Sequence, residues 1–152
     1  MVVDPEPVRD SLPKYDFNSM NRKWSRFNCS ENAEAYYKEE LGVPGIFAGI
    51  ITTAAFDLTL TITKNDVTTL RESTFKTSSQ VFPLDQTTLI ETKFGDFTYK
   101  WHQSGDNYLK VEKVKLEENI RETVVYTVVN DFLKITQTHG QKSAYFYLQP
   151  SE

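Results

Sequence analysis

Residues 56–63 read FDLTLTIT, and their strict alternation decides the fold class of this chain. The apolar and polar members of this segment are, in turn, Phe56, Leu58, Leu60 and Ile62, and Asp57, Thr59, Thr61 and Thr63. Side chains of a β-strand point alternately to the two faces of the sheet. The segment is therefore predicted to be a strand with one apolar and one polar face.

The same period continues to about residue 149 in short segments that are separated by turn signals such as Asn65-Asp66, Asn130-Asp131 and His139-Gly140. These segments cover residues 67–75, 79–84, 87–94, 97–103, 108–114, 119–129, 132–138 and 142–149. Together with residues 56–63 and an earlier strand over 22–29, they make ten predicted strands. Short connections favour antiparallel neighbours in an up-and-down order.

A sheet with this many strands should close on itself, because closure removes exposed strand edges. Residues 31–41 and 44–54 predict two helices between the first and second strands, with Ser30 as a cap, Gly42 as a stop and Pro44 opening the second helix. We therefore predict an all-β protein, a ten-stranded up-and-down antiparallel barrel of the calycin-like clamshell type with a helix-turn-helix lid. Such a barrel is wide enough to enclose a cavity.

The composition excludes several functional classes. The 152 residues fit one domain, and we assign 1–16 to an extended or flexible leader and 17–152 to the barrel. A net charge of −4 with scattered basic residues argues against a nucleic-acid partner. The single cysteine, Cys29, and the lack of a signal segment or of a run long enough to span a membrane predict a cytosolic protein with access to the nucleus. We also expect a monomer. His102 and His139 have no partners at metal-ligand spacing, so no metal and no cofactor are expected.

Five motifs, in order along the chain, resemble the intracellular lipid-binding proteins, which comprise the fatty-acid-binding and cellular retinoid-binding proteins. They are MNRKW (20–24), SENAEAYYKEELGV (30–43), ESTFKTSSQVF (72–82), NIRE (119–122), and THG with SAYFYLQ (138–149). The resemblance covers about residues 17–149. It implies a lumen that holds one or two long-chain lipids, with a carboxylate anchored by one late-strand arginine and an Arg-x-Tyr pair on the last strand.

On this resemblance, Arg121 matches the late-strand arginine, Tyr147 the tyrosine of the pair, and Tyr145 stands where the family has arginine. A guanidinium suits a carboxylate because its planar donors can bind both oxygens. Two alternatives remain open. Arg121 can instead form a surface ion pair, and a register slip of one residue on the last strand would put Phe146 and Leu148 inside.

The resemblance also implies that Phe75 lies in the turn that faces the second helix at the portal. From their apolar character, Ile46, Phe47 and Ile50 of that helix are expected to touch lipid or line the entrance. The expected function is a non-enzymatic carrier for a fatty acid or a retinoid-like amphiphile, which contacts membranes transiently through the lid. The second helix lacks a basic residue, which argues against charge-driven membrane contact. The alternatives are a lipid-modifying enzyme, a secreted lipocalin-type barrel, and an interaction module that recruits a partner through residues 1–16.

Overall fold

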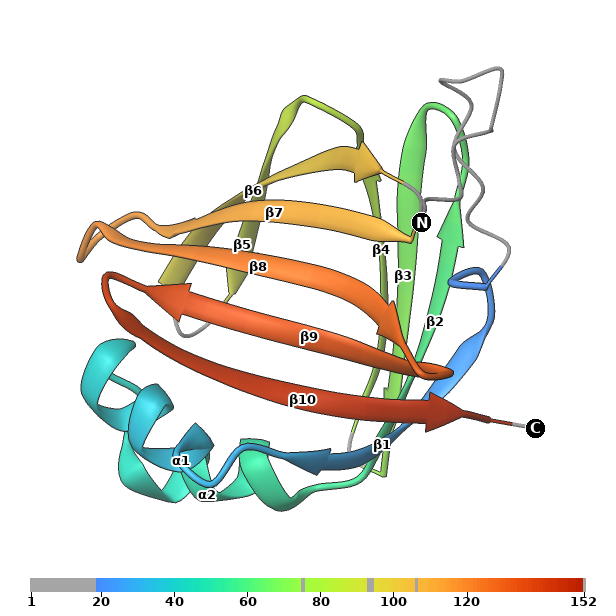
Figure 1. Cartoon of the computed structure of the whole chain (residues 1–152). Helices are drawn as coiled ribbons and strands as arrows, with labels where there is room; N and C mark the ends of the chain where they lie inside the picture. Colours follow the sequence, from blue (N-terminus) through green and yellow to red (C-terminus); the bar gives the residue numbers. More distant parts are fainter. Residues whose placement is uncertain (1–18, 75, 93–94, 106, 152) are drawn as a thin grey trace, which may run out of the picture.

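The structure is a computed structural model that describes residues 19–74, 76–92, 95–105 and 107–151. Its ten strands form one antiparallel sheet in the order β4-β3-β2-β1-β10-β9-β8-β7-β6-β5 (Figure 1). The strands are β1 (Lys23–Cys29), β2 (Phe56–Ile62), β3 (Asp66–Ser73), β4 (Thr77–Pro83), β5 (Thr87–Thr92), β6 (Gly95–Gly105), β7 (Tyr108–Lys115), β8 (Ile120–Val129), β9 (Phe132–His139) and β10 (Lys142–Pro150). The predicted up-and-down order is confirmed. The predicted leader, residues 1–16, lies outside the described residues.

The first and last strands close the sheet into a barrel. β1 pairs with β2 on one side and with β10 on the other, and a bulge between Arg26 and Asn28 shifts its register against β10. β4 and β5 lie at the two ends of the strand order, so the barrel is nearly closed. The backbone N–H of Asp85 donates to the carbonyl of Trp101 at 2.8 Å, which ties the turn after β4 to β6.

Three short helical segments between β1 and β2 form the lid at one end of the barrel (Figure 1). They are α1 (Ala33–Ala35), the π-helix η2 (Tyr36–Glu40) and α2 (Gly45–Thr53). Gly42 has a φ of +70° and ends the first part, as predicted. Ser30 does not cap α1, because its hydroxyl accepts a hydrogen bond from the backbone N–H of Tyr145 at 3.1 Å. Pro44 is the N-cap of α2 and not its first helical residue.

The apolar face predicted for β2 points inward. Phe56, Leu58, Leu60 and Ile62 are all buried and join one apolar cluster with residues from β1, β3, β4 and β6–β10. Trp24 belongs to this cluster, and its indole Nε1 donates to the carbonyl of Met20 at 3.1 Å. The alternation of β2 thus sets which face of each neighbouring strand lines the barrel.

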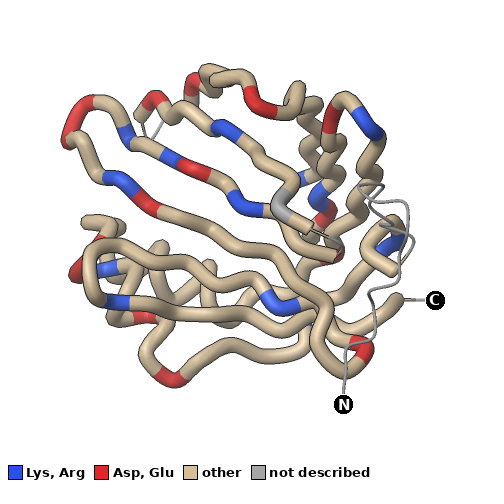
Figure 2. The backbone as a smooth tube through the Cα atoms, turned by 45° about the horizontal axis from the view of Figure 1, so that its top comes forward, with Lys and Arg blue, Asp and Glu red and all other residues tan. Residues whose placement is uncertain are grey.

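Along the described part of the backbone, the positions of Lys and Arg alternate with those of Asp and Glu and are spread over many strands (Figure 2). Within the described part of the chain, no helix has the length and apolar character that a membrane crossing requires. Within the same residues, no group of three or more His, Cys, Asp and Glu side chains is placed to hold a metal ion.

Candidate ligand-binding site

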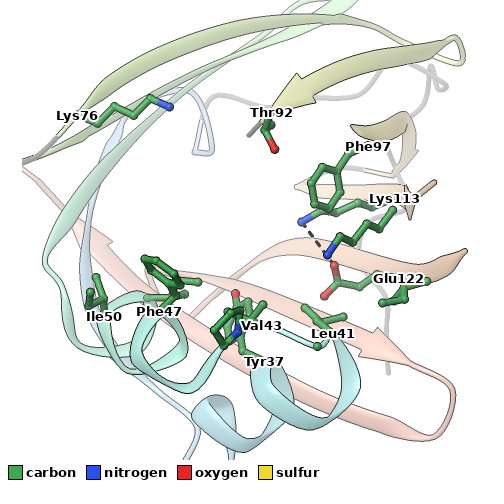
Figure 3. A pocket seen from close by; sticks show the side chains of 15 residues that line it. Tyr37, Leu41, Val43, Phe47, Ile50, Lys76, Thr92, Phe97, Lys113 and Glu122 are labelled. Carbon is green, nitrogen blue, oxygen red and sulfur yellow. Dashed lines mark ion pairs between the residues drawn. The ribbon is translucent and has the colours of Figure 1, made fainter. Parts of the chain in front are cut away.

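A cavity of about 630 Å³ lies between the lid and the inner walls of β6, β7 and β8 (Figure 3). The lid contributes mainly apolar side chains, and the strands contribute both aromatic and charged ones. The lining residues are Tyr37, Leu41, Gly42, Val43, Pro44, Phe47, Ile50, Ile51, Lys76, Thr92, Phe97, Lys113, Lys115, Ile120 and Glu122. The cavity is large enough for a small molecule, since such sites commonly measure about 300–1,000 Å³.

The helix α2 forms one side of this cavity. Phe47 and Ile50 both line it, and the exposed fractions of these residues are 41% and 46% (Figure 3). The structure therefore places Phe47 at the cavity. The other predicted portal residue, Phe75, lies outside the described residues.

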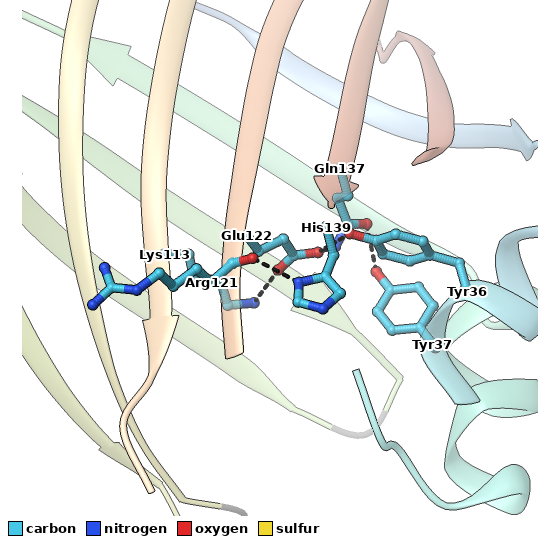
Figure 4. Close-up of polar contacts among 7 residues, drawn as sticks. All are labelled: Tyr36, Tyr37, Lys113, Arg121, Glu122, Gln137 and His139. Carbon is cyan, nitrogen blue, oxygen red and sulfur yellow. Dashed lines mark hydrogen bonds and ion pairs between the residues drawn. The ribbon is translucent and has the colours of Figure 1, made fainter. Parts of the chain in front are cut away.

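The structure places Arg121 outside the lumen, which corrects the expected orientation of this side chain. On β8, Arg121 is exposed, whereas its neighbour Glu122 is 5% exposed and lines the cavity. Figure 4 shows the guanidinium of Arg121 directed away from the carboxylate of Glu122. The inward face of β8 is the more apolar one, with Ile120, Val124 and Tyr126 beside Glu122, so alternation turns Arg121 to the outer face.

The last strand also presents a different face from the one expected. The buried residues of β10 are Ala144, Phe146 and Leu148, so Tyr145 and Tyr147 lie on the outer face. There the ammonium of Lys134 lies over both tyrosine rings, at 4.7 and 5.7 Å from their centroids. The one-residue register slip is therefore the correct alternative for this strand, and neither tyrosine lines a described cavity.

Glu122 is the centre of a polar network between the barrel and the lid (Figure 4). Its carboxylate accepts hydrogen bonds from the hydroxyl of Tyr36 at 3.0 Å and from Nε2 of Gln137 at 2.7 Å. Nζ of Lys113 lies 3.6 Å from the same carboxylate, and the hydroxyl of Tyr37 donates to Oε1 of Gln137 at 2.6 Å. Because Tyr36 and Tyr37 belong to η2, this network fastens the lid to β7, β8 and β9.

Burial raises the pKa of three tyrosines in this region. Desolvation is the main cause that raises the pKa of Tyr36 and of Tyr37 well above 10.0, and the negative charge of Glu122 adds to it. On β8, burial likewise raises the pKa of Tyr126 to about 12, although the positive charge of Arg71 opposes this effect. All three hydroxyls therefore remain hydrogen-bond donors at neutral pH.

A second, smaller chamber of about 160 Å³ shares Tyr37 and Lys113 with the first. Its other lining residues are Phe56, Arg71, Tyr99, Trp101, Val111, Val124, Tyr126, Ile135, Gln137 and Phe146. The guanidinium of Arg71 lies 4.0 Å from the ring centroid of Phe56. Arg71 was not among the site residues predicted from the sequence. It lies an even number of positions from the buried Val67 and pairs with Leu58 of β2, so it is on the inward face of β3.

Comparison with solved structures identifies the fold. A fatty acid binding protein of Schistosoma mansoni in complex with arachidonic acid has a TM-score of 0.79 and 23% identity, covering 90% of this chain and 98% of the other. Lipid binding protein 8 of Caenorhabditis elegans has a TM-score of 0.78 and 15% identity, covering 91% and 99%. A secretory abundant heat soluble protein of Ramazzottius varieornatus has a TM-score of 0.76 and 20% identity, covering 88% and 96%.

No family model matches the sequence, and no curated protein matches it either. The fold is nevertheless that of the fatty-acid-binding and other intracellular lipid-binding proteins, as the motifs in the sequence predicted. The heat soluble protein shows that proteins described in other terms have this fold too, so function must be argued from the site.

Proposed function

We propose that this protein is a non-enzymatic carrier that holds a long-chain fatty acid or a similar amphiphile inside its barrel. The observation that carries the proposal is the cavity of about 630 Å³ beneath the lid, whose lid side is formed by Leu41, Val43, Phe47, Ile50 and Ile51. Transfer of an alkyl chain from water to such walls is favourable by about 0.8 kcal/mol per buried CH₂ group. The arachidonic acid in the Schistosoma mansoni protein supports a ligand of this class.

The proposed route for the ligand passes the mouth of the cavity beside Phe47 and Ile50. Both side chains are partly exposed and also line the cavity, so they can contact a ligand on its way in. Wider opening requires the lid to move away from the barrel, which breaks the hydrogen bonds of Tyr36 to Glu122 and of Tyr37 to Gln137. Uptake and release are then limited by the opening of the lid.

The charged groups of the described structure favour binding over catalysis. The carboxylate of Glu122 already has three partners at hydrogen-bond or ion-pair distance, which are Tyr36, Gln137 and Lys113. The clearest histidine–acid cluster joins Nδ1 of His102 to Asp85 at 2.9 Å and Nε2 to Glu112 at 2.6 Å. None of these three residues lines either chamber, so the cluster is not placed to act on a bound ligand.

The proposal includes a cytosolic monomer that has access to the nucleus and that touches membranes transiently. Ile46, Phe47 and Ile50 of α2 are all more than one-third exposed. Because α2 has no basic residue, membrane contact through this helix would depend on apolar insertion and not on attraction to anionic lipids.

Calorimetric titration of the delipidated protein with hexadecanoic acid tests the carrier function. We expect one saturable site in the wild type and weak or no binding to Ile120→Trp, because Ile120 lines the cavity and the larger ring occupies it. Val129→Trp is the matched control, since Val129 stands on the outer face of the same strand and is 38% exposed. Absence of binding to the wild type, or equal binding to both variants, would refute a carrier that uses this cavity.

A further inference from the structure

Arg71 is an exposed residue at the inner wall of the barrel, and no carboxylate among the described residues pairs with it. Arg71 is on the inward face of β3 and lines the smaller chamber. Among the described residues it forms no ion pair with a carboxylate, and its contact is with the face of the Phe56 ring. Lys113, the other cation of this chamber, is paired with Glu122. Among the described residues that line this chamber, Arg71 is therefore a cation without a carboxylate partner.

The polar groups around Arg71 are donors that lack acceptors. The indole Nε1 of Trp101 is buried and has no hydrogen-bond partner in the described structure, although Trp101 is 3% exposed and lines the chamber. Tyr126, whose ring lies 5.2 Å from that of Trp101, also lines the chamber, and its hydroxyl has no partner among the described residues. The buried Nε1 of Trp101 without an acceptor is unfavourable by about 1–3 kcal/mol.

A carboxylate meets both requirements at once. It brings one negative charge and two acceptor oxygens, and it offers no donor of its own when ionised. A phosphate monoester would bring close to two charges into a chamber that has one to neutralise. The volume of about 160 Å³ can accommodate a carboxylate head group while the alkyl chain extends past Tyr37 and Lys113 into the larger cavity.

We propose that Arg71, with Tyr126 beside it, is the anion anchor of this barrel and selects amphiphiles that end in a carboxylate. The inference rests on the proposed carrier function and names the head group of its ligand. It assigns to a third-strand arginine the role that Arg121 was expected to have. β8 and β10 do not provide the expected arginine anchor, because Arg121 is on the outer face and Phe146 and Leu148 occupy the inward positions of β10.

The test compares three probes of equal chain length, hexadecanoic acid, hexadecanol and hexadecyl phosphate, on the wild type, Arg71→Gln and Arg121→Gln. We expect Arg71→Gln to weaken binding of the acid about 10- to 100-fold, as the loss of a charged hydrogen bond does. The affinity for the alcohol should change less than about twofold, because its hydroxyl head group carries no charge for Arg71 to neutralise. Arg121→Gln should leave all affinities unchanged. Circular dichroism and thermal unfolding confirm that each variant is folded.

The outcomes separate the anchor from the carrier. If Arg71→Gln binds the acid as tightly as the wild type does, the anchor is refuted while the carrier function stands. Equal losses of affinity for the acid and the alcohol would show that Arg71 supports the structure of the barrel wall and does not bind the carboxylate. This result would also refute the anchor. Tighter binding of the phosphate than of the acid would overturn the preference for a carboxylate. If the wild type binds none of the probes, the carrier function fails and the anchor with it.

Discussion

Replacing Tyr36 with phenylalanine tests whether the network at Glu122 holds the lid on the barrel. The substitution removes one hydroxyl, which donates to the Glu122 carboxylate at 3.0 Å, and keeps the ring. Tyr36 is 2% exposed, so water cannot readily replace the lost donor. A hydrogen bond to a charged group contributes about 1.5–3 kcal/mol to stability. For a domain of this size, a loss of about 2 kcal/mol lowers the melting temperature by about 4–8 °C.

The assay is urea and thermal unfolding at neutral pH, followed by circular dichroism, with Tyr145→Phe as the matched control. Tyr145 belongs to the outer face of β10, and its hydroxyl makes no hydrogen bond within the described residues. Its substitution should change the free energy of unfolding by less than about 0.5 kcal/mol. Equal effects of the two substitutions, or an unchanged stability in Tyr36→Phe, would refute the claim that this hydrogen bond fastens the lid.

Three further predictions address the alkaline limit of stability, the mouth of the cavity and the core. Because folding raises the pKa of Tyr126 from 10.0 to about 12, the unfolded state loses this proton first, and the free energy of unfolding should fall as the pH rises through this window. Measured against pH, the free energy of unfolding of Tyr126→Phe should fall less steeply than that of Tyr145→Phe. Phe47→Ala should speed release of hexadecanoic acid in stopped-flow displacement by about fivefold, while Ile46→Ala, on a residue that does not line the cavity, should not; equal rates would contradict the proposed route. Leu133→Ala should lower the free energy of unfolding in urea by about 2–5 kcal/mol, because Leu133 is 0% exposed, and a loss below this range would argue against tight packing there.

The fold could be predicted because its signal is local. The period-two pattern of FDLTLTIT and of the later segments needs only the geometry of a strand. Turn residues then divide these segments, and short connections leave an up-and-down barrel as the natural arrangement. The helical lid was found for the same reason, since Gly42 and the apolar spacing around it are visible in the sequence alone.

The inner face of β8 could not be predicted in this way. One face contains Glu122 and the other Arg121, so each has one charge among apolar and hydroxyl residues. Glu122 can be buried because Tyr36, Gln137 and Lys113 satisfy it, and these partners come from three other elements. No local pattern reveals such a network. The similarity of NIRE to a family motif then favoured Arg121, which is in fact on the outer face.

The incorrect prediction of which face of β10 points inward and the failure to identify Arg71 from the sequence have related causes. A tyrosine side chain has both an apolar ring and a polar hydroxyl, so Tyr145 and Tyr147 suited either face of the strand. The sequence therefore did not distinguish Ala144, Phe146 and Leu148 as the inward-facing residues of β10. Residues 67–75 hold several threonines and charged side chains, so no face of this strand stood out as the inward one. An arginine that faces a ligand chamber breaks the rule that inward positions are apolar. Functional sites are where such exceptions are expected.

A crystal structure of the protein with hexadecanoic acid would locate both ends of the bound ligand. We expect density for the alkyl chain beneath α2, in contact with Phe47 and Ile120, and for the carboxylate within hydrogen-bond distance of the Arg71 guanidinium. A fatty acid bound only on the outer surface of the barrel, beside Arg121 or Tyr147, would contradict this expectation.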